Sequence, residues 1–174
     1  MPGWLDGQML IRDAKPAELA QVGDIRVAAY RADGFLSPDS SYEPMLRSLG
    51  ADAGDVVLVA VRDDGALVGT VMLQRWPETG PLVTRPDEAE IRALAVLPGA
   101  RGSGLGRALL AAVIDRAVRG NVRHLLLFSQ IEMKAAHRLY EEAGFARLPE
   151  RDWSPEPGVL LLAYGLVLAT RATA

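Results

Sequence analysis

The fold is decided by residues 88–128, which read EAEIRALAVLPGARGSGLGRALLAAVIDRAVRGNVRHLLLF. Residues 88–97 predict a strand, and the apolar stripe that starts after Gly104 predicts a helix ending near Gly120. Residues 122–128 are an almost unbroken apolar run, which is typical of a strand covered on both faces. Strand, helix and strand in this order predict a crossover unit with two parallel strands.

The segments on either side of this unit predict one mixed α/β domain. An Asp-Gly pair separates two β-branched runs, residues 55–62 and 66–75, and predicts an antiparallel hairpin. Further helices are expected over residues 16–30, 43–49 and 134–143, and further strands over residues 10–13, 145–148 and 159–168. We predict a single domain over residues 9–174 and a flexible N-terminal extension over residues 1–8.

Composition and charge exclude several classes of function. A net charge of −3 and a pI near 5.4 provide no field that would attract nucleic acid. The absence of cysteine excludes disulfides, thiolate metal sites and a cysteine nucleophile, so that a thiol in the chemistry has to arrive on a cofactor. The N-terminus does not resemble a secretion signal, and no apolar run reaches the length of about 20 residues that spans a bilayer. A cytoplasmic protein without nucleic-acid or membrane partners is expected.

The glycines at positions 102, 104 and 106 are the strongest chemical signal. They let the backbone turn tightly at a helix start, where exposed N–H groups favour an anion such as a diphosphate. Arg101 and Arg107 add positive charge at the edges of this nest. A turn that only reverses the chain explains the glycines equally well. The dinucleotide-binding spacing and the Walker A pattern both fail here.

Three segments in a fixed order resemble the GNAT superfamily of acyl-CoA-dependent N-acyltransferases. They are residues 90–98 (EIRALAVLP), residues 101–106 (RGSGLG) and residues 139–145 (LYEEAGF). The resemblance implies the GNAT fold, a mixed central sheet of about six to seven strands, splayed between the fourth and fifth and flanked by about four helices. It also implies an N-acetyltransferase that transfers the acetyl group of acetyl-CoA to a primary amine by direct attack in a ternary complex.

The resemblance implies a cofactor site without a metal. The diphosphate sits on backbone N–H groups of the loop, and the pantetheine arm pairs with the end of the preceding strand. The implied residues are Leu94, Ala95, Val96, Arg101, Gly102, Ser103, Gly104, Leu105, Gly106 and Arg107. One position departs from the family, because Met133 stands where an Asn often contacts the cofactor. That contact is lost, replaced by Ser129 or Gln130, or made by apolar packing.

Two catalytic residues follow from the same resemblance. Tyr140 matches a tyrosine that protonates the departing thiolate or steadies it with a hydrogen bond, although a core tyrosine with a satisfied hydroxyl fits the same helical stripe. Glu90 aligns with an acidic residue that serves as general base, often through a water. Strand alternation places Glu90, Arg92, Leu94 and Val96 on one face, so a solvated Glu90–Arg92 ion pair is the alternative.

The amine acceptor lies outside the matched segments. By family analogy, its cleft walls are residues 31–43, with Asp33, Phe35 and Tyr42, and residues 148–158, with Trp153; ordinary surface loops are the alternative. The acceptor is a small-molecule or peptide amine, and the protein a monomer or homodimer. His124 and His137 have no metal-ligand spacing and are expected to be structural. The alternative function is a catalytically weak acyl-CoA-binding or regulatory domain.

Overall fold

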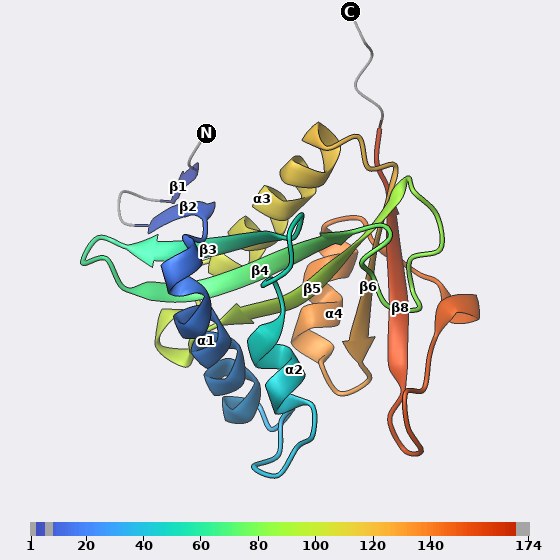
Figure 1. Cartoon of the computed structure of the whole chain (residues 1–174), viewed down its shortest axis with the longest axis horizontal. Coiled ribbons are helices and arrows are strands. Elements are labelled where there is room, and N and C mark those ends of the chain that lie inside the picture. The colour runs from blue at the N-terminus through green and yellow to red at the C-terminus, as the bar shows by residue number, and fades with distance from the viewer. Residues whose placement is uncertain (1–2, 6–8, 170–174) are drawn as a thin grey trace, which may run out of the picture. The chain divides into compact units, whose positions relative to one another are not determined.

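The computed structural model describes residues 3–5 and 9–169 (Figure 1). The helices are α1 (Leu19–Ala32), α2 (Glu43–Ser48), α3 (Leu105–Arg119) and α4 (Lys134–Glu142), with 3-10 turns η1 (Pro16–Glu18), η2 (Pro98–Ala100) and η3 (Pro149–Arg151). The strands are β1 (Gly3–Leu5), β2 (Met9–Asp13), β3 (Val56–Arg62), β4 (Leu67–Arg75), β5 (Glu88–Val96), β6 (His124–Gln130), β7 (Ala146–Arg147) and β8 (Leu161–Val167). The four expected helices are confirmed.

The strands of the described residues form one mixed sheet in the order β1-β2-β3-β4-β5-β6-β8-β7. β5 and β6 pair in parallel, in register from Glu88↔His124 to Ile91↔Leu127, as the crossover unit predicts. The separation of these two strands beyond that register stays a prediction. The sheet has one strand more than the upper expectation, because Gly3–Leu5 pairs with β2. Residues 1–2 and 6–8 of the expected extension lie outside the described residues.

Contacts divide the chain into two compact units, residues 1–72 with 93–113 and residues 73–92 with 114–174. Both units draw on β4, β5 and α3, and the single domain expected over residues 9–174 stays a prediction. The division separates the expected site residues as well. The glycine loop belongs to the first unit, whereas Glu90 and Tyr140 belong to the second.

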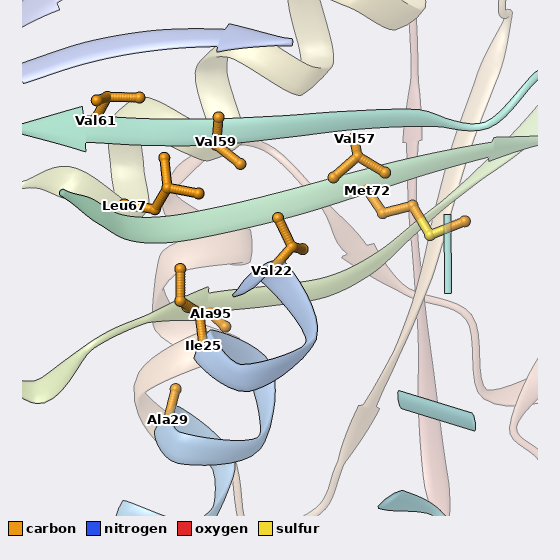
Figure 2. Packing of buried hydrophobic residues seen from close by; sticks show 9 residues of the cluster. All are labelled: Val22, Ile25, Ala29, Val57, Val59, Val61, Leu67, Met72 and Ala95. Carbon is orange, nitrogen blue, oxygen red and sulfur yellow. The ribbon is translucent and has the colours of Figure 1, made fainter. Parts of the chain in front are cut away.

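The core of the first unit lies between α1 and the strands β3, β4 and β5. In Figure 2, Val22, Ile25 and Ala29 of α1 point toward apolar side chains of these strands, which include Val59 and Ala95. Their spacing of three and four residues gives α1 one apolar face, which explains the helix predicted from the sequence.

A second cluster joins α1 to α2, which lie side by side (Figure 1). Val27, Leu36 and Leu46 are its buried members. Arg26 is fully buried beside them, and its Nη1 donates to the carbonyls of Leu46 (3.2 Å) and Leu49 (2.7 Å) at the end of α2. These bonds hold α2 at the end of the α1–α2 connection.

The second unit is organised around a buried carboxylate. Glu88 at the start of β5 accepts hydrogen bonds from Nη2 of Arg151 (2.9 Å), Nη2 of Arg85 (3.2 Å) and the N–H of Thr84 (2.9 Å). Nδ1 of His124 lies 3.6 Å from the same side chain. Although burial raises the pKa of Glu88, the hydrogen bonds from Arg151 and Thr84 outweigh it and lower the pKa to about 2. This cluster ties the loop before β5 to η3.

Candidate functional site

The glycine loop of the first unit is exposed and left-handed at two positions. It follows η2, and Gly102 and Gly104 have φ of 84° and 79°. A Cβ built on either glycine would meet nothing within 4 Å. Glycine is therefore required by the backbone conformation rather than by crowding.

The loop delivers backbone N–H groups to the start of α3. The first N–H groups of an α-helix have no partner within the helix and carry the positive end of its dipole. Ser103 directs its hydroxyl to the carbonyl of Ala100 (3.2 Å), which tightens the turn before the helix. This backbone geometry suits an anion such as a diphosphate.

A close approach fixes this helix start on the sheet. A Cβ on Gly69 of β4 would lie 3.0 Å from Leu109, 3.2 Å from the carbonyl of Ala95 and 3.5 Å from Leu105. Leu105 and Leu109 are buried. Glycine at position 69 therefore lets the first turns of α3 lie directly on β4, beside the end of β5.

Arg101 directs its guanidinium to β5 and α1. Its Nε donates to the carbonyl of Val96 (3.1 Å), and its Nη1 donates to the carboxylate of Asp33 (2.6 Å). Its Nη2 lies 3.5 Å from the carbonyl of Ala29. The sequence assigned Arg101 to the edge of the anion nest and Asp33 to an acceptor wall, but the structure pairs the two side chains with each other.

The end of β5 leaves the extended backbone at one residue. Ala93 has φ of 52°, in the left-handed region, and packs against the cluster of Val27, Leu36 and Leu46. This φ departs from the extended backbone on which strand alternation depends, and the shared face expected for residues 90, 92, 94 and 96 stays a prediction. The backbone of Leu94, Ala95 and Val96 comes after this residue.

The other expected acceptor residues of the first unit are partly covered. Phe35 and Tyr42 are half-buried, and Tyr42 packs on the α1–α2 cluster. Glu43, the last residue of the acceptor wall expected over residues 31–43, is paired with Arg31 and with Arg47. The carboxylates of Asp33 and Glu43 therefore already have arginine partners.

In the second unit, Glu90 is buried rather than solvated. It is 5% exposed, and its Oε1 lies 3.9 Å from Nε of Arg92. Nη1 of Arg92 donates to the side-chain oxygen of Gln74 (3.2 Å). Burial raises the pKa of Glu90 to about 7, against the opposing charge of Arg92. The alternative of a solvated ion pair is wrong, because this carboxyl is withdrawn from water.

Tyr140 of α4 lies in a buried aromatic cluster. Its ring centroid is 5.9 Å from that of Phe145 and 6.1 Å from that of Tyr164, which also contacts His137 (5.5 Å) and lies below the Arg147 guanidinium (5.4 Å). Burial, followed by the interaction with Tyr164, raises the pKa of Tyr140 to about 12. The phenol stays protonated at neutral pH.

Met133, which stands where the family often has an Asn, lies at the start of α4. Met133 is the N-cap of α4 and makes no side-chain capping bond. Ser129, on β6, is 3% exposed, and its hydroxyl has no hydrogen-bond partner in the described residues. His137 lies 3.0 Å through Nε2 from the carbonyl of Gln130, so it ties α4 to the end of β6. This is the structural role expected for His137.

Trp153 lies at the edge of β8. It forms a bridge with Leu161, stacks on Phe128 at 5.9 Å and is 40% exposed.

The sequence analysis did not predict the Glu88 cluster, although the spacing of Thr84, Arg85 and Glu88 was a local signal for it. Within the described residues, no group of three or more metal-ligating side chains is assembled, and no helix is long and apolar enough to cross a membrane.

Comparison with known proteins identifies a matching family and several relatives of known name. The family model "Acetyltransferase (GNAT) family" matches residues 19–145. The chain is 30% identical over 135 residues to an aminoglycoside N(6')-acetyltransferase type 1 of Stenotrophomonas maltophilia, covering 78% of this chain and 84% of that relative. It is 33% identical over 90 residues to a mycothiol acetyltransferase of Paenarthrobacter aurescens, covering 52% of this chain but only 27% of that relative.

Two solved structures share the fold. An acetyltransferase of the GNAT family from Staphylococcus aureus superimposes with a TM-score of 0.72 at 18% identity, covering 92% of this chain and 99% of the other. A Salmonella typhimurium protein solved with its cofactor acetyl-CoA gives a TM-score of 0.67 at 24% identity, covering 95% and 97%. The family match spans β5, the glycine loop and α4, whose geometry is described above, and the chain belongs to the GNAT family of acetyltransferases.

Proposed function

We propose that this protein is an N-acetyltransferase that moves the acetyl group of acetyl-CoA to a primary amine. One observation carries the proposal, the left-handed glycine loop that leads from the end of β5 into the N-terminus of α3. A relative that acetylates aminoglycosides, to judge by its name, and a structural neighbour that holds acetyl-CoA support it.

The glycine loop and the end of β5 bind the cofactor through their backbones. Backbone N–H groups of residues 102–107 bind the diphosphate, and the backbone of residues 94–96 pairs with the pantetheine arm. The open space around Gly102 and Gly104 supports this role, because an anion needs direct access to the backbone. Arg107 adds positive charge next to the loop.

Glu90 is proposed as the general base. The acceptor ammonium has to lose a proton before its nitrogen attacks the thioester carbonyl carbon. A base is most effective when its pKa lies near the working pH, and burial raises the pKa of Glu90 to about 7. The ammonium proton passes to Glu90, directly or through water.

Tyr140 is proposed to act on the leaving group. When the carbon–sulfur bond breaks, the electron pair stays on sulfur as a thiolate, and the comparable thiol of cysteine has an ordinary pKa of about 8.5. Because burial raises the pKa of Tyr140 to about 12, full proton transfer to this thiolate is uphill. We therefore favour a hydrogen bond from the phenol that stabilises the thiolate, which then takes its proton from solvent. The second proton of the acceptor nitrogen leaves to solvent after the carbon–nitrogen bond has formed.

The alternative is a domain that binds acyl-CoA but turns over weakly. Met133 favours this alternative, because a thioether at the N-cap of α4 donates no hydrogen bond to a cofactor. The unpartnered hydroxyl of Ser129 and the backbone of Gln130 remain as substitutes.

Thiol release from acetyl-CoA decides between the two functions. The protein is incubated with acetyl-CoA and a panel of amines that includes an aminoglycoside, amino acids, polyamines and a peptide with a free N-terminus. Saturable thiol release with one amine supports the transferase. Tight binding of acetyl-CoA without release on any amine supports the binding domain, and no binding at all contradicts both.

A further inference from the structure

We propose that Arg101 is a positioning residue that ties the glycine loop to α1 and β5, and that it does not itself bind an anion. The proposal deepens the proposed function, because it rests on the loop being the diphosphate site. It changes the role of the one arginine that opens the loop motif.

The guanidinium of Arg101 uses each of its three nitrogen atoms. Nε bonds the carbonyl of Val96 at 3.1 Å, Nη1 bonds Asp33 at 2.6 Å, and Nη2 approaches the carbonyl of Ala29 at 3.5 Å. A planar fork with fixed donor directions suits three separate acceptors, which the single ammonium of lysine cannot match. All three acceptors and Arg101 belong to the first compact unit.

The partners on α1 favour a cation for a general reason. Ala29 is in the last turn of α1, whose final carbonyls have no partner within the helix and carry the negative end of its dipole. Asp33 is the C-cap residue and adds a full negative charge. The charge of Arg101 is therefore already balanced where it lies.

Global stability does not explain this arrangement. The side chains of Arg101 and Asp33 are 38% and 36% exposed, and exposed ion pairs are worth about 0–1 kcal/mol. The ordering of the loop explains the arrangement better. Its glycines at positions 102 and 104 have no neighbour within 4 Å of a Cβ position, and glycine is the residue with the most backbone freedom. A tether at Arg101 restricts that freedom and aligns the N–H groups before a ligand arrives.

Two variants separate positioning from direct binding. If Arg101 bound phosphate, Asp33→Asn would free the Arg101 guanidinium from its carboxylate partner, and CoA affinity would stay the same or rise. Arg101→Lys would keep the positive charge and most of the affinity. If Arg101 is a tether, both variants loosen the loop and weaken CoA binding. The matched control is the exposed pair of Arg62 and Asp64 (2.7 Å) in the β3–β4 turn of the same unit.

Two measurements are made on the full chain and on the variants Asp33→Asn, Arg101→Lys, Arg62→Lys and Asp64→Asn. The first is calorimetric titration with CoA at several salt concentrations, and the second is amide hydrogen exchange of residues 102–106 without ligand. We expect about tenfold weaker CoA binding in both Asp33→Asn and Arg101→Lys, an unchanged salt dependence of Kd, and faster exchange in the loop. The control variants should match the wild type in both measurements.

Unchanged or tighter CoA binding by Asp33→Asn, or wild-type affinity in Arg101→Lys, would overturn the tether. If the wild type binds no CoA, the proposed function fails, and loop exchange alone decides the tether. Faster exchange at residues 102–106 in both variants then supports it, and unchanged exchange rejects it.

Discussion

The carboxylate of Glu88 and the guanidinium of Arg151 form a 2.9 Å hydrogen bond across 63 positions of the chain. The Glu88 side chain is fully buried, and Arg151 also donates to the carbonyl of Leu82 at 3.2 Å. This pair makes the second unit dependent on the ionisation of one carboxyl group.

Acid should weaken the contribution of Glu88 to the stability of the fold. The folded pKa of Glu88, about 2, lies below its ordinary value of 4.5, so its contribution to stability is complete above pH 4.5 and is lost as the pH falls toward 2. We expect Glu88→Gln to lower the free energy of unfolding by roughly 3 kcal/mol at pH 7 and by much less at pH 3. Urea titrations at both pH values, with exposed Glu132→Gln as control, measure this. An equal loss at both pH values contradicts it.

The pKa of Glu90 is shifted in the opposite direction to that of Glu88, so its effect on stability has the opposite dependence on pH. Its folded pKa, about 7, lies above the ordinary 4.5, so stability falls as the pH rises from 4.5 through 7, and the full cost remains above that. Glu90→Gln should therefore be more stable than the wild type at pH 8, by up to roughly 3 kcal/mol, and similar to it below pH 4.5. Thermal melts at pH 4 and 8 check this, with exposed Glu78→Gln as the comparison.

The same substitution tests catalysis. If Glu90 is the base, kcat/KM of the wild type rises with pH through about 7, because the carboxylate form is the active one. Glu90→Gln should lose that rise and about 100-fold or more of the rate. A Glu90→Gln profile with the same inflection would assign the titration to another group.

Tyr140→Phe tests the leaving-group role. Removing one phenol hydroxyl should lower kcat about 10- to 1,000-fold with little change in acetyl-CoA affinity, because the ring packing against Phe145 is kept. Tyr164→Phe is the matched control, since it removes a buried hydroxyl from the same cluster and should retain kcat. Equal kcat in wild type and Tyr140→Phe would make Tyr140 a core residue.

Gly104→Val tests the loop. Valine disfavours φ of 79°, at a cost of roughly 1–2 kcal/mol, so the loop has to change conformation and acetyl-CoA binding should be lost. Gly65→Val is matched to it, because Gly65 in the β3–β4 turn has φ of 83° and open space around its Cβ position. It should lose similar stability but bind acetyl-CoA as the wild type does. Full affinity in Gly104→Val would refute the loop assignment.

Local chemistry explains which parts of the fold were predictable. The turn between β3 and β4 follows from Asp64 and Gly65, because Asp64 caps the N–H of Ala66 and Gly65 supplies the positive φ. The glycine loop and α3 follow in the same way from adjacent residues. Each of these predictions needed only a short stretch of sequence.

Distant partners explain the rest. Arg101 was assigned to an anion because nothing in its neighbourhood indicates Asp33, 68 positions away. The burial of Glu90 depends on how other elements cover β5, and strand alternation does not reveal it. Charge on a loop residue is visible in the sequence, whereas the partner that neutralises it is set by tertiary structure.

The left-handed conformation of Ala93 has a consequence for variation at this position. Valine and isoleucine are common in strand interiors. Because they branch at Cβ, they rarely adopt the left-handed backbone that Ala93 has. Ala93 also packs against the α1–α2 cluster, where a longer side chain would need new room. In a library of variants, position 93 should therefore tolerate small residues such as glycine and reject the residues that its strand neighbours accept.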